Sequence, residues 1–196
     1  MSKYKTFIPD HLIAHRPKFL KFFGKLVMRI TGWKTLGHFP KDERVVLVVG
    51  PHTSNWDFVL AMSAVLSWDI HIHWLGKDSI FKKGFRRLLK SLGGIPVNRT
   101  NPQDLMDEIQ AIAAEYQGFI IGMAPEGTRK KVARLKTGFL RIAKQTNSKI
   151  MLAGIDFSNK TIQLGEFFTP SGDIEKDLEN ISNYFSNFSG KRPELS

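Results

Sequence analysis

Apolar and polar residues follow one another along this chain in a pattern that predicts strands and helices in turn. Short, nearly continuous apolar runs alternate with longer stretches in which apolar residues recur every three or four positions. Apolar runs of this kind are typical of strands that are buried on both faces of a sheet. The predicted strands are residues 44–49, 70–75, 95–97, 118–123, 149–155 and, as an edge strand, 161–164.

The stretches between these runs have the spacing of helices. The predicted helices are residues 17–30, 56–67, 79–92, 102–116, 135–145 and 173–188. Asn101 and Asp173 are residue types that cap helix N-termini. The short polar tail from Ser189 is expected to fray. Strands that alternate with helices predict an α/β fold, a single three-layer domain with a mainly parallel sheet flanked by helices.

The first predicted helix is amphipathic. Its cations follow spacings of three and four, which places Lys18, Lys21, Lys25 and Arg29 on one face. Apolar residues, among them three phenylalanines, fill much of the rest. This pattern is typical of a helix that lies at a membrane surface, and equally of a helix that docks on its own domain. We expect residues 1–40 to form a membrane-surface region and residues 41–190 to form the α/β domain.

Composition narrows the chemistry that the chain can perform. Its 196 residues suffice for one domain with a full core. Cysteine is absent, which excludes disulfides, thiolate metal sites and cysteine nucleophiles. No metal-ligand spacing, phosphate loop or dinucleotide fingerprint occurs, so we expect neither a metal nor a cofactor. No signal peptide is recognisable, and no apolar run approaches the length of a membrane-spanning helix.

The net charge of +11, from 29 basic and 18 acidic residues, predicts an anionic partner. Nucleic acid, an anionic membrane and a phosphorylated substrate are the candidates. The cations gather at strand ends and on two predicted helices, and no aromatic-basic motif of a known RNA-binding type occurs. We therefore expect no nucleic-acid partner, although a nucleic-acid-binding module remains the alternative from another functional class.

A histidine and an aspartate follow the first long apolar run. His52 and Asp57 stand five positions apart, directly after the strand predicted over 44–49, at the strand end where open α/β sheets place their chemistry. The two side chains can touch only if His52 lies in the turn and Asp57 in the first helical turn. The residues between them include helix-capping types, with Ser54 a better cap than nucleophile. Such a pair is a candidate general base.

Three cations follow other predicted strands in the same way. Lys77 follows 70–75, Arg99 ends the stretch after 95–97, and Arg129 lies in the turn after 118–123. The carboxyl ends of parallel strands share one edge of a sheet, so these groups are expected near His52. Guanidinium groups bind phosphate through two parallel hydrogen bonds. One base among three cations fits a neutral nucleophile that is attached to a phosphate.

These motifs together resemble those of the glycerolipid acyltransferase family, of the lysophosphatidate acyltransferase type. Its first block is a histidine and an aspartate with four residues between, matched by His52 and Asp57; the family usually has asparagine where this chain has Pro51. The second block runs to an arginine and is matched by residues 94–99. The third is Glu-Gly-Thr-Arg, residues 126–129, and a fourth, at 150–155, lacks the usual proline. The resemblance covers roughly residues 45–157.

The resemblance implies transfer of a fatty acyl group from an acyl thioester to a hydroxyl of a lysophospholipid or related phosphorylated acceptor. His52 would act as general base and Asp57 would orient it. The remaining site residues would bind phosphate (Arg99, Arg129 and Lys77) or support the site (Glu126, Gly127 and Thr128). No nucleophile-elbow pattern occurs, which favours direct transfer. Backbone amides at the start of the helix at 56–67 are candidate donors to the oxyanion.

The expected partners follow from this reaction. They are an acyl thioester donor (acyl-coenzyme A or acyl carrier protein), a lysophospholipid acceptor and an anionic membrane surface. The basic helix predicted over 79–92 could meet lipid headgroups, the phosphates of coenzyme A or an acidic acyl carrier protein. We expect a peripheral location at the cytoplasmic face of the inner membrane, with residues 41–190 as the acyltransferase domain. A noncatalytic protein that binds anionic lipid is a further alternative.

Overall fold

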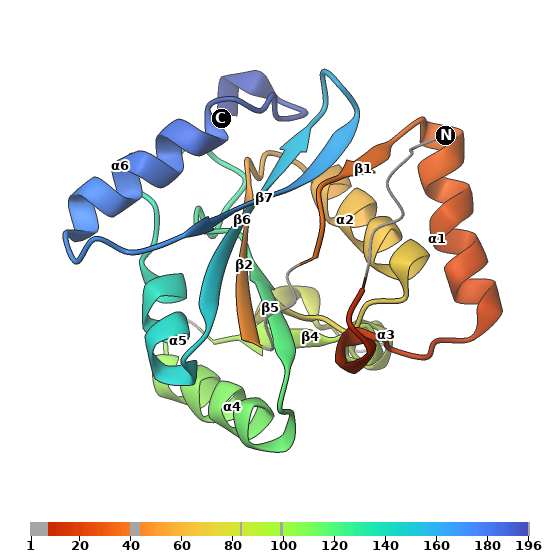
Figure 1. Ribbon diagram of the computed structural model, residues 1–196, viewed down its shortest axis with the longest axis horizontal. Coiled ribbons are helices and arrows are strands. Elements are labelled where there is room, and N and C mark those ends of the chain that lie inside the picture. Colours follow the sequence, from red (N-terminus) through yellow and green to blue (C-terminus); the bar gives the residue numbers. More distant parts are fainter. Residues whose placement is uncertain (1–7, 40–43, 83, 99, 196) are drawn as a thin grey trace.

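A seven-stranded sheet forms the centre of the molecule, with helices on both faces (Figure 1). The computed structural model describes residues 8–39, 44–82, 84–98 and 100–195. The strand order is β1-β7-β6-β2-β5-β3-β4, and all pairs are parallel except β6 with β7. The strands are β1 (Lys34–Leu36), β2 (Arg44–Gly50), β3 (His73–Lys77), β4 (Gly94–Val97), β5 (Phe119–Met123), β6 (Lys149–Asp156) and β7 (Thr161–Phe168). The predicted α/β fold class is confirmed.

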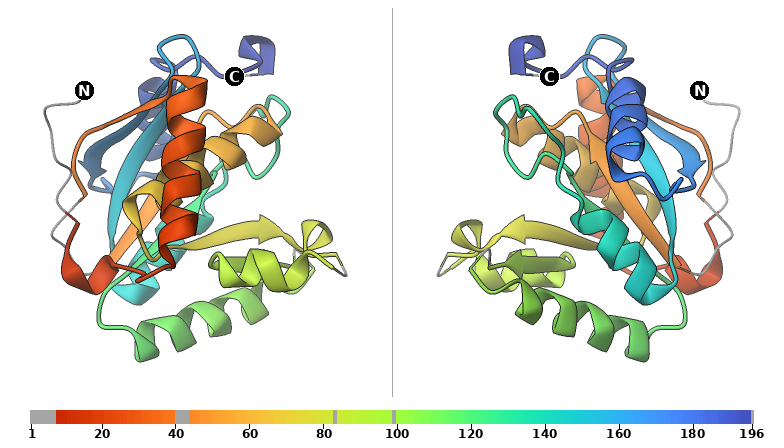
Figure 2. Two further views of the ribbon diagram at one scale, coloured as in Figure 1. Left: turned by 90° about the vertical axis from the view of Figure 1, so that its right-hand side faces the viewer. Right: turned by 90° about the vertical axis from the view of Figure 1, so that its left-hand side faces the viewer.

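Two groups of helices cover the sheet. Helices α2 and α3 pack on one face with α1 against α2, while α4, α5 and α6 pack on the other face (Figure 2). None of the described helices is long and apolar enough to cross a bilayer. The helices are α1 (Lys18–Thr31), α2 (Asn55–Trp68), α3 (Arg86–Ser91), α4 (Pro102–Glu115), α5 (Gly138–Thr146) and α6 (Ile174–Phe185), with 3₁₀ turns η1 (Asp10–Leu12), η2 (Asp78–Ile80) and η3 (Pro193–Leu195).

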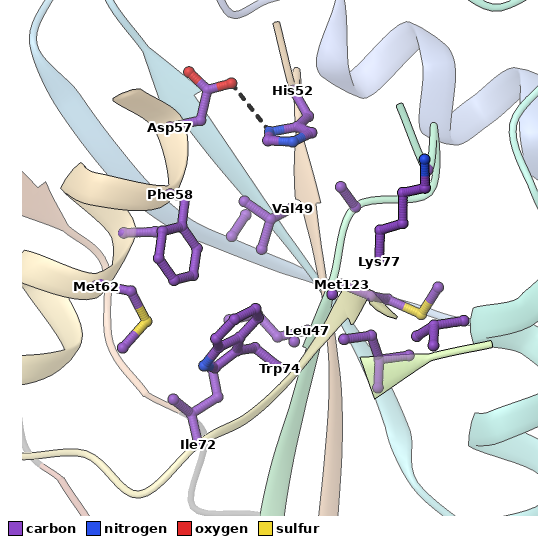
Figure 3. Close-up of a pocket in the computed structure, with 18 of the residues that line it drawn as sticks. Leu47, Val49, His52, Asp57, Phe58, Met62, Ile72, Trp74, Lys77 and Met123 are labelled. Atoms are coloured by element: carbon purple, nitrogen blue, oxygen red, sulfur yellow. Dashed lines mark ion pairs between the residues drawn. The ribbon is translucent and has the colours of Figure 1, made fainter. Parts of the chain in front are cut away.

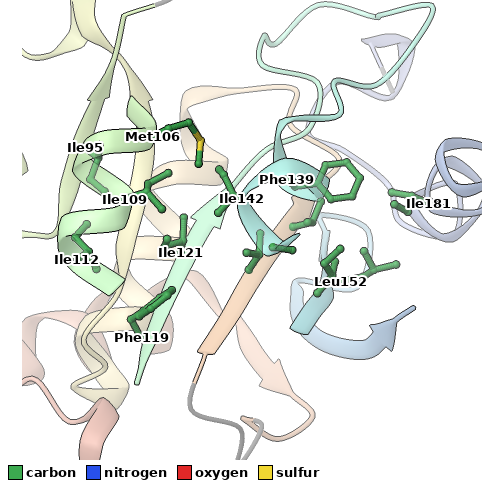
Figure 4. Close-up of a cluster of buried hydrophobic side chains, with 14 of the residues drawn as sticks. Ile95, Met106, Ile109, Ile112, Phe119, Ile121, Phe139, Ile142, Leu152 and Ile181 are labelled. Carbon is green, nitrogen blue, oxygen red and sulfur yellow. The ribbon is translucent and has the colours of Figure 1, made fainter. Parts of the chain in front are cut away.

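The central strand β2 is apolar on both sides because each of its faces packs against a helical layer. Successive side chains of a strand point to opposite faces. Val45 and Leu47 accordingly belong to the core on the α2 side, and Val46 and Val48 belong to the core on the α4 side. Figure 4 shows this second core, in which side chains from the sheet meet those of α4, α5 and α6. Burial on both faces explains why the run contains no polar residue.

The bounds of several predicted elements differ in the structure, among them the strand at 70–75 and the helices at 79–92 and 135–145. The strand predicted over 70–75 begins only at His73, because Ile70 and Ile72 fill the core in the connection from α2. The helix predicted over 79–92 is interrupted. Gly84 has a φ of 100°, a left-handed conformation that does not continue an α-helix, and only η2 and the six-residue α3 form. Helix α5 likewise begins at Gly138 rather than at residue 135.

The far edge of the sheet also departs from the prediction. Strand β7 runs to Phe168 and is antiparallel to β6, but it is not an edge strand. The three residues of β1 pair with it in parallel and form the edge themselves. With the sequence Lys-Thr-Leu, β1 has no apolar run that could signal a strand.

Of the two residues predicted to cap helices, Asp173 does so and Asn101 does not. Oδ1 of Asp173 accepts hydrogen bonds from the amides of Glu175 and Lys176, which confirms it as the cap of α6. Asn101 precedes α4 but makes no side-chain hydrogen bond to the backbone of that helix. Its amide instead donates to Oδ1 of Asp104, at 2.5 Å.

Helix α1 docks on α2 through a glycine. A Cβ on Gly24 would lie 2.6 Å from the carbonyl oxygen of Ser63 and 2.6 Å from the amide nitrogen of Ser67. The side chain of Lys21 adds an ion pair to Asp69 at 2.9 Å. The helix therefore packs on its own domain, yet five of its large apolar side chains stay exposed: Phe19, Phe22, Phe23, Leu26 and Ile30. The expected boundary between residues 40 and 41 lies outside the described residues.

Candidate active site

His52 and Asp57 form a contact at the carboxyl end of the central strand. His52 lies in the turn after β2, and Asp57 lies in the first turn of α2. Nδ1 of His52 is 3.1 Å from Oδ2 of Asp57 (Figure 3). Because Nδ1 faces the carboxylate, Nε2 is the ring nitrogen that remains for a substrate in the cavity that His52 lines. The predicted geometry of this pair is present.

Asp57 is held by the same residues that begin its helix. Oδ2 accepts the backbone amides of Thr53 and Ser54, each at 2.7 Å, and Oδ1 accepts the hydroxyl of Ser54 at 2.8 Å. Burial by itself raises the pKa of Asp57, but hydrogen bonds from His52 and Ser54 outweigh it and hold the pKa below its usual value. Ser54 is thus the cap of α2, as expected, and the carboxylate stays ionised beside the imidazole.

This arrangement narrows the candidate donors to an oxyanion. The sequence makes the amides at the start of this helix candidate donors to an oxyanion, but those of Thr53 and Ser54 bind Asp57. The amide of Trp56 binds Oγ of Ser54 at 3.1 Å. A donor that is already engaged at the helix cap is not free for a developing charge, so these three amides are excluded as candidates.

Glu126 connects the second motif to the first. Strand β5 pairs with β2, so the turns after the two strands are neighbours. The backbone amide of His52 donates to Oε1 and Oε2 of Glu126, at 3.0 Å each. Burial raises the pKa of Glu126, partly offset by the amide of His52. The carboxylate therefore positions the backbone that carries the histidine, a role that the sequence does not reveal.

The predicted cations have separate positions. Arg129 donates to Oδ1 of Asn55, at the first residue of α2, and lines the same cavity as His52. Lys77 lines the cavity at the end of β3 (Figure 3). The structure therefore brings both together with the His52–Asp57 pair. Arg99 lies outside the described residues.

Lys136 is a cation of the site that sequence reasoning missed. It lines the cavity, and among the described residues it has no carboxylate partner. Gly127 has a φ of 62°, and a Cβ on it would lie 2.8 Å from Nζ of Lys136. The lysine therefore lies over the glycine of the third motif. The sequence places it inside the helix predicted over 135–145 and does not distinguish it from its basic neighbours, whereas in the structure it lies two residues before α5.

The cavity itself has a volume of about 1280 Å³. Five cations line it together with His52 (Lys77, Arg129, Arg134, Lys136 and Arg141), and apolar side chains of α2 and of the sheet line much of the rest. Labelled in Figure 3 are six of the apolar side chains: Leu47, Val49, Phe58, Met62, Ile72 and Trp74. Ligand pockets commonly measure about 300–1000 Å³. The space fits a molecule with a long apolar chain, an anionic group and a reacting centre beside His52. Among the described residues, no group of three or more histidines and carboxylates is placed to hold a metal.

Comparison with known proteins agrees with this geometry. The model of a protein family described as Acyltransferase matches residues 33–156, which include both motif turns. The chain belongs to the acyltransferase family. The resemblance seen in the motifs is thereby confirmed, and with it the prediction of an O-acyltransferase at the level of the family.

A solved structure has the same fold. The 1-acyl-sn-glycerophosphate (LPA) acyltransferase PlsC from Thermotoga maritima superposes with a TM-score of 0.59 and 19% sequence identity, over 87% of this chain and 76% of that chain. At this identity the likeness concerns the fold. A search of curated proteins gave no match.

The C-terminal segment of this acyltransferase returns to the turn that carries His52. The amide of Arg192 donates to Oγ1 of Thr53, the residue after His52, at 3.2 Å. Nζ of Lys191 lies 4.4 Å from the centroid of the Trp56 ring. The carbonyl of Ser189 accepts the amide of Phe157 at 2.8 Å. The expectation of a frayed tail is wrong, because backbone groups tie it to the domain.

Proposed function

We propose that this acyltransferase moves a fatty acyl group from an acyl thioester, acyl-coenzyme A or acyl carrier protein, directly to a hydroxyl of a lysophospholipid or related phosphorylated acceptor. One observation carries the proposal. The His52–Asp57 pair lines a cavity whose walls carry several cations and a large apolar surface. An amphiphile with a phosphate and a fatty chain would fit this cavity with its reactive centre beside His52.

In the proposed reaction Nε2 of His52 removes the proton from the acceptor hydroxyl as its oxygen attacks the thioester carbonyl. The new C–O bond forms a tetrahedral intermediate, and the C–S bond then breaks. The leaving thiolate takes the proton from the imidazolium, so the products are an ester and a free thiol. Asp57, whose lowered pKa keeps it charged, stabilises the imidazolium.

The cations have the role of binding anionic groups in this proposal. Arg129 and Lys77 line the cavity, and Lys136 joins them over Gly127. Arg99 is included on its motif position alone. Glu126 supports the site by holding the amide of His52.

Direct transfer is supported by the hydrogen bonds of the two hydroxyl groups that follow His52 in the chain. Oγ of Ser54 donates to Asp57 and accepts from the amide of Trp56, so it serves the helix cap. Thr53 is buried, and its hydroxyl accepts from Arg192. Neither is placed as a nucleophile activated by His52.

The location proposed for this reaction is the cytoplasmic face of the inner membrane, where the protein would be peripheral. Support comes from α1, whose exposed phenylalanines and cations resemble those of interfacial helices. Residues 1–40 would serve as the membrane-surface region and residues 41–190 as the acyltransferase domain.

The test is transfer by purified protein, with acyl-coenzyme A and acyl carrier protein as donors and a panel of lysophospholipids as acceptors, read by mass spectrometry. His52→Ala should lose roughly 10²- to 10⁴-fold in rate while it still binds the acceptor. A variant that transfers at the parent rate would show that the base is assigned wrongly. Salt-dependent RNA binding without any transfer would favour the nucleic-acid alternative.

A further inference from the structure

Exposed large apolar side chains are concentrated on one side of the molecule. Among the described residues, ten of the thirteen belong to α1, α2 and the stretch from η2 to α3. These elements lie on the same side of the sheet (Figures 1 and 2). The members outside α1 are Trp56, Val59, Ile80, Phe85 and Leu88. A one-sided distribution of this size marks an interaction surface rather than scattered exposure.

The stretch from η2 to α3, residues 78–91, combines apolar and basic groups. Ile80, Phe85 and Leu88 are 45%, 65% and 53% exposed. Four exposed cations accompany them, and among the described residues none of the four has a carboxylate partner: Lys82, Arg86, Arg87 and Lys90. By contrast, Arg134 in the loop before α5 pairs with Glu175 of α6. Unpaired cations beside exposed apolar side chains suit an anionic lipid surface.

This stretch also borders the cavity. Lys77, Ser79, Ile80 and Leu89 line the cavity from the β3–α3 side, and Val59 lines it from α2. Ile80 and Val59 are in addition exposed to solvent, at 45% and 41%. The cavity therefore reaches the surface where these two side chains are exposed, within the apolar side of the molecule.

We propose that residues 78–91 are a second membrane-contact site, which binds an anionic bilayer together with α1. Ile80, Phe85 and Leu88 would enter the interface while the cations meet lipid phosphates. A lysophospholipid could then pass from the bilayer into the cavity past Val59 and Ile80, a step that rests on the proposed function. The three apolar side chains, and the shared side with α1, favour a bilayer over an acidic carrier protein as the occupant.

Vesicle binding tests the proposed membrane-contact site independently of acyl transfer. The full chain is mixed with sedimentable vesicles of phosphatidylcholine, with and without phosphatidylglycerol, and the bound fraction is measured. The variants are F85S/L88S and R86E/R87E. Matched controls lie on α5 and α6, across the sheet: I174S, and K144E/K176E. Thermal unfolding confirms that each variant folds.

Each α3 variant should lower the binding constant for phosphatidylglycerol vesicles roughly tenfold or more, while the controls bind within about twofold of the parent. R86E/R87E should also lose the preference for anionic vesicles. Folded variants that bind like the parent would overturn the proposal. The proposal would also be overturned if the variants bound vesicles like the parent but were defective in transfer from acyl carrier protein alone. That result would assign the surface to the carrier protein. A parent that binds vesicles through α3 but transfers no acyl group would instead refute the proposed function.

Discussion

The backbone amide of His52 lies 3.0 Å from each carboxylate oxygen of Glu126. This contact joins the turn after β2 to the turn after β5, 74 residues later in the chain. It fixes the backbone of the histidine, while Asp57 fixes the ring. Two carboxylates from different elements thus determine where Nε2 lies.

Glu126→Gln should lower kcat roughly tenfold to a hundredfold with little change in thermal stability. The glutamine side chain keeps one oxygen that can accept from the backbone N–H of His52, but it lacks the negative charge and the second acceptor oxygen. Steady-state kinetics with the best donor and acceptor pair measure the effect. Glu179→Gln, an exposed substitution on α6, is the matched control. Equal kinetics for both variants would remove the positioning role of Glu126.

Asp57→Asn should reduce kcat by about 10²- to 10⁴-fold, because the amide no longer stabilises the imidazolium. The same carboxylate belongs to the capping box, so stability should fall as well. Ser54→Ala separates the two effects. It removes the cap at a cost of about 1 kcal/mol in unfolding free energy, but leaves the His52–Asp57 contact. A similar loss of kcat in both variants would assign the effect to helix capping alone.

Thr53→Val should reduce both stability and kcat. The substitution keeps the shape of the side chain but leaves the amide of Arg192 without its acceptor, a loss of about 1–2 kcal/mol. Displacement of the C-terminal segment would then loosen the turn that carries His52. Denaturant unfolding and steady-state kinetics measure the two quantities. Thr53→Ser retains the hydroxyl and should recover kcat; if it does not, the hydrogen bond is not the cause.

Lys136→Met should raise the half-saturating concentration of the phosphorylated acceptor roughly tenfold, with a smaller effect on kcat. Its ammonium group lies over Gly127 at the cavity and supplies positive charge there. Lys144→Met, on the exposed face of α5 and away from the cavity, should leave both constants unchanged. An unchanged half-saturating concentration in Lys136→Met would exclude the lysine from acceptor binding.

Stability should fall in acid because of His73. Burial lowers the pKa of His73 to about 4, and the neighbouring His71 adds to this, whereas Glu115 opposes it. The unfolded chain has the ordinary value of about 6.5, so it binds the proton first as pH falls. Folding therefore loses free energy between pH 6.5 and about 4, on the order of 2 kcal/mol for a ring that is partly exposed.

The neutral variant His73→Phe is the comparison for this effect. Its denaturant unfolding curves should depend less on pH across that window than those of the parent. Parallel losses of stability in both proteins would assign the acid sensitivity to other groups.

The sequence predicts those parts of the fold that apolar runs specify. Strands β2, β5 and β6 are continuous hydrophobic segments and lie where the pattern predicts. Strand β1 escapes prediction because three residues of mixed polarity are recruited by backbone pairing to β7. The interruption before α3 depends on the backbone angle of Gly84, which residue type alone does not fix.

The site, like the fold, has parts that the sequence predicts and parts that it does not. The motifs predict that His52, Asp57 and Arg129 meet, because each has a distinctive side chain at a strand end. The contacts of Glu126 with His52 and of Arg192 with Thr53 use backbone amides, which every residue type except proline possesses. Sequence patterns cannot distinguish one such amide from another. Sequence patterns do not single out Lys136 either, because it is one of several cations in its loop.

The close approach at Gly24 has a consequence for how the molecule meets its surroundings. At Gly24 no side chain separates α1 from α2, and Met28 packs beside this contact against Leu60 and Ala64, so the first helix is already docked on the domain while its phenylalanines are exposed. A segment that folds only on contact loses conformational entropy at that moment. The preformed face of α1 would avoid this loss if the proposed membrane contact takes place.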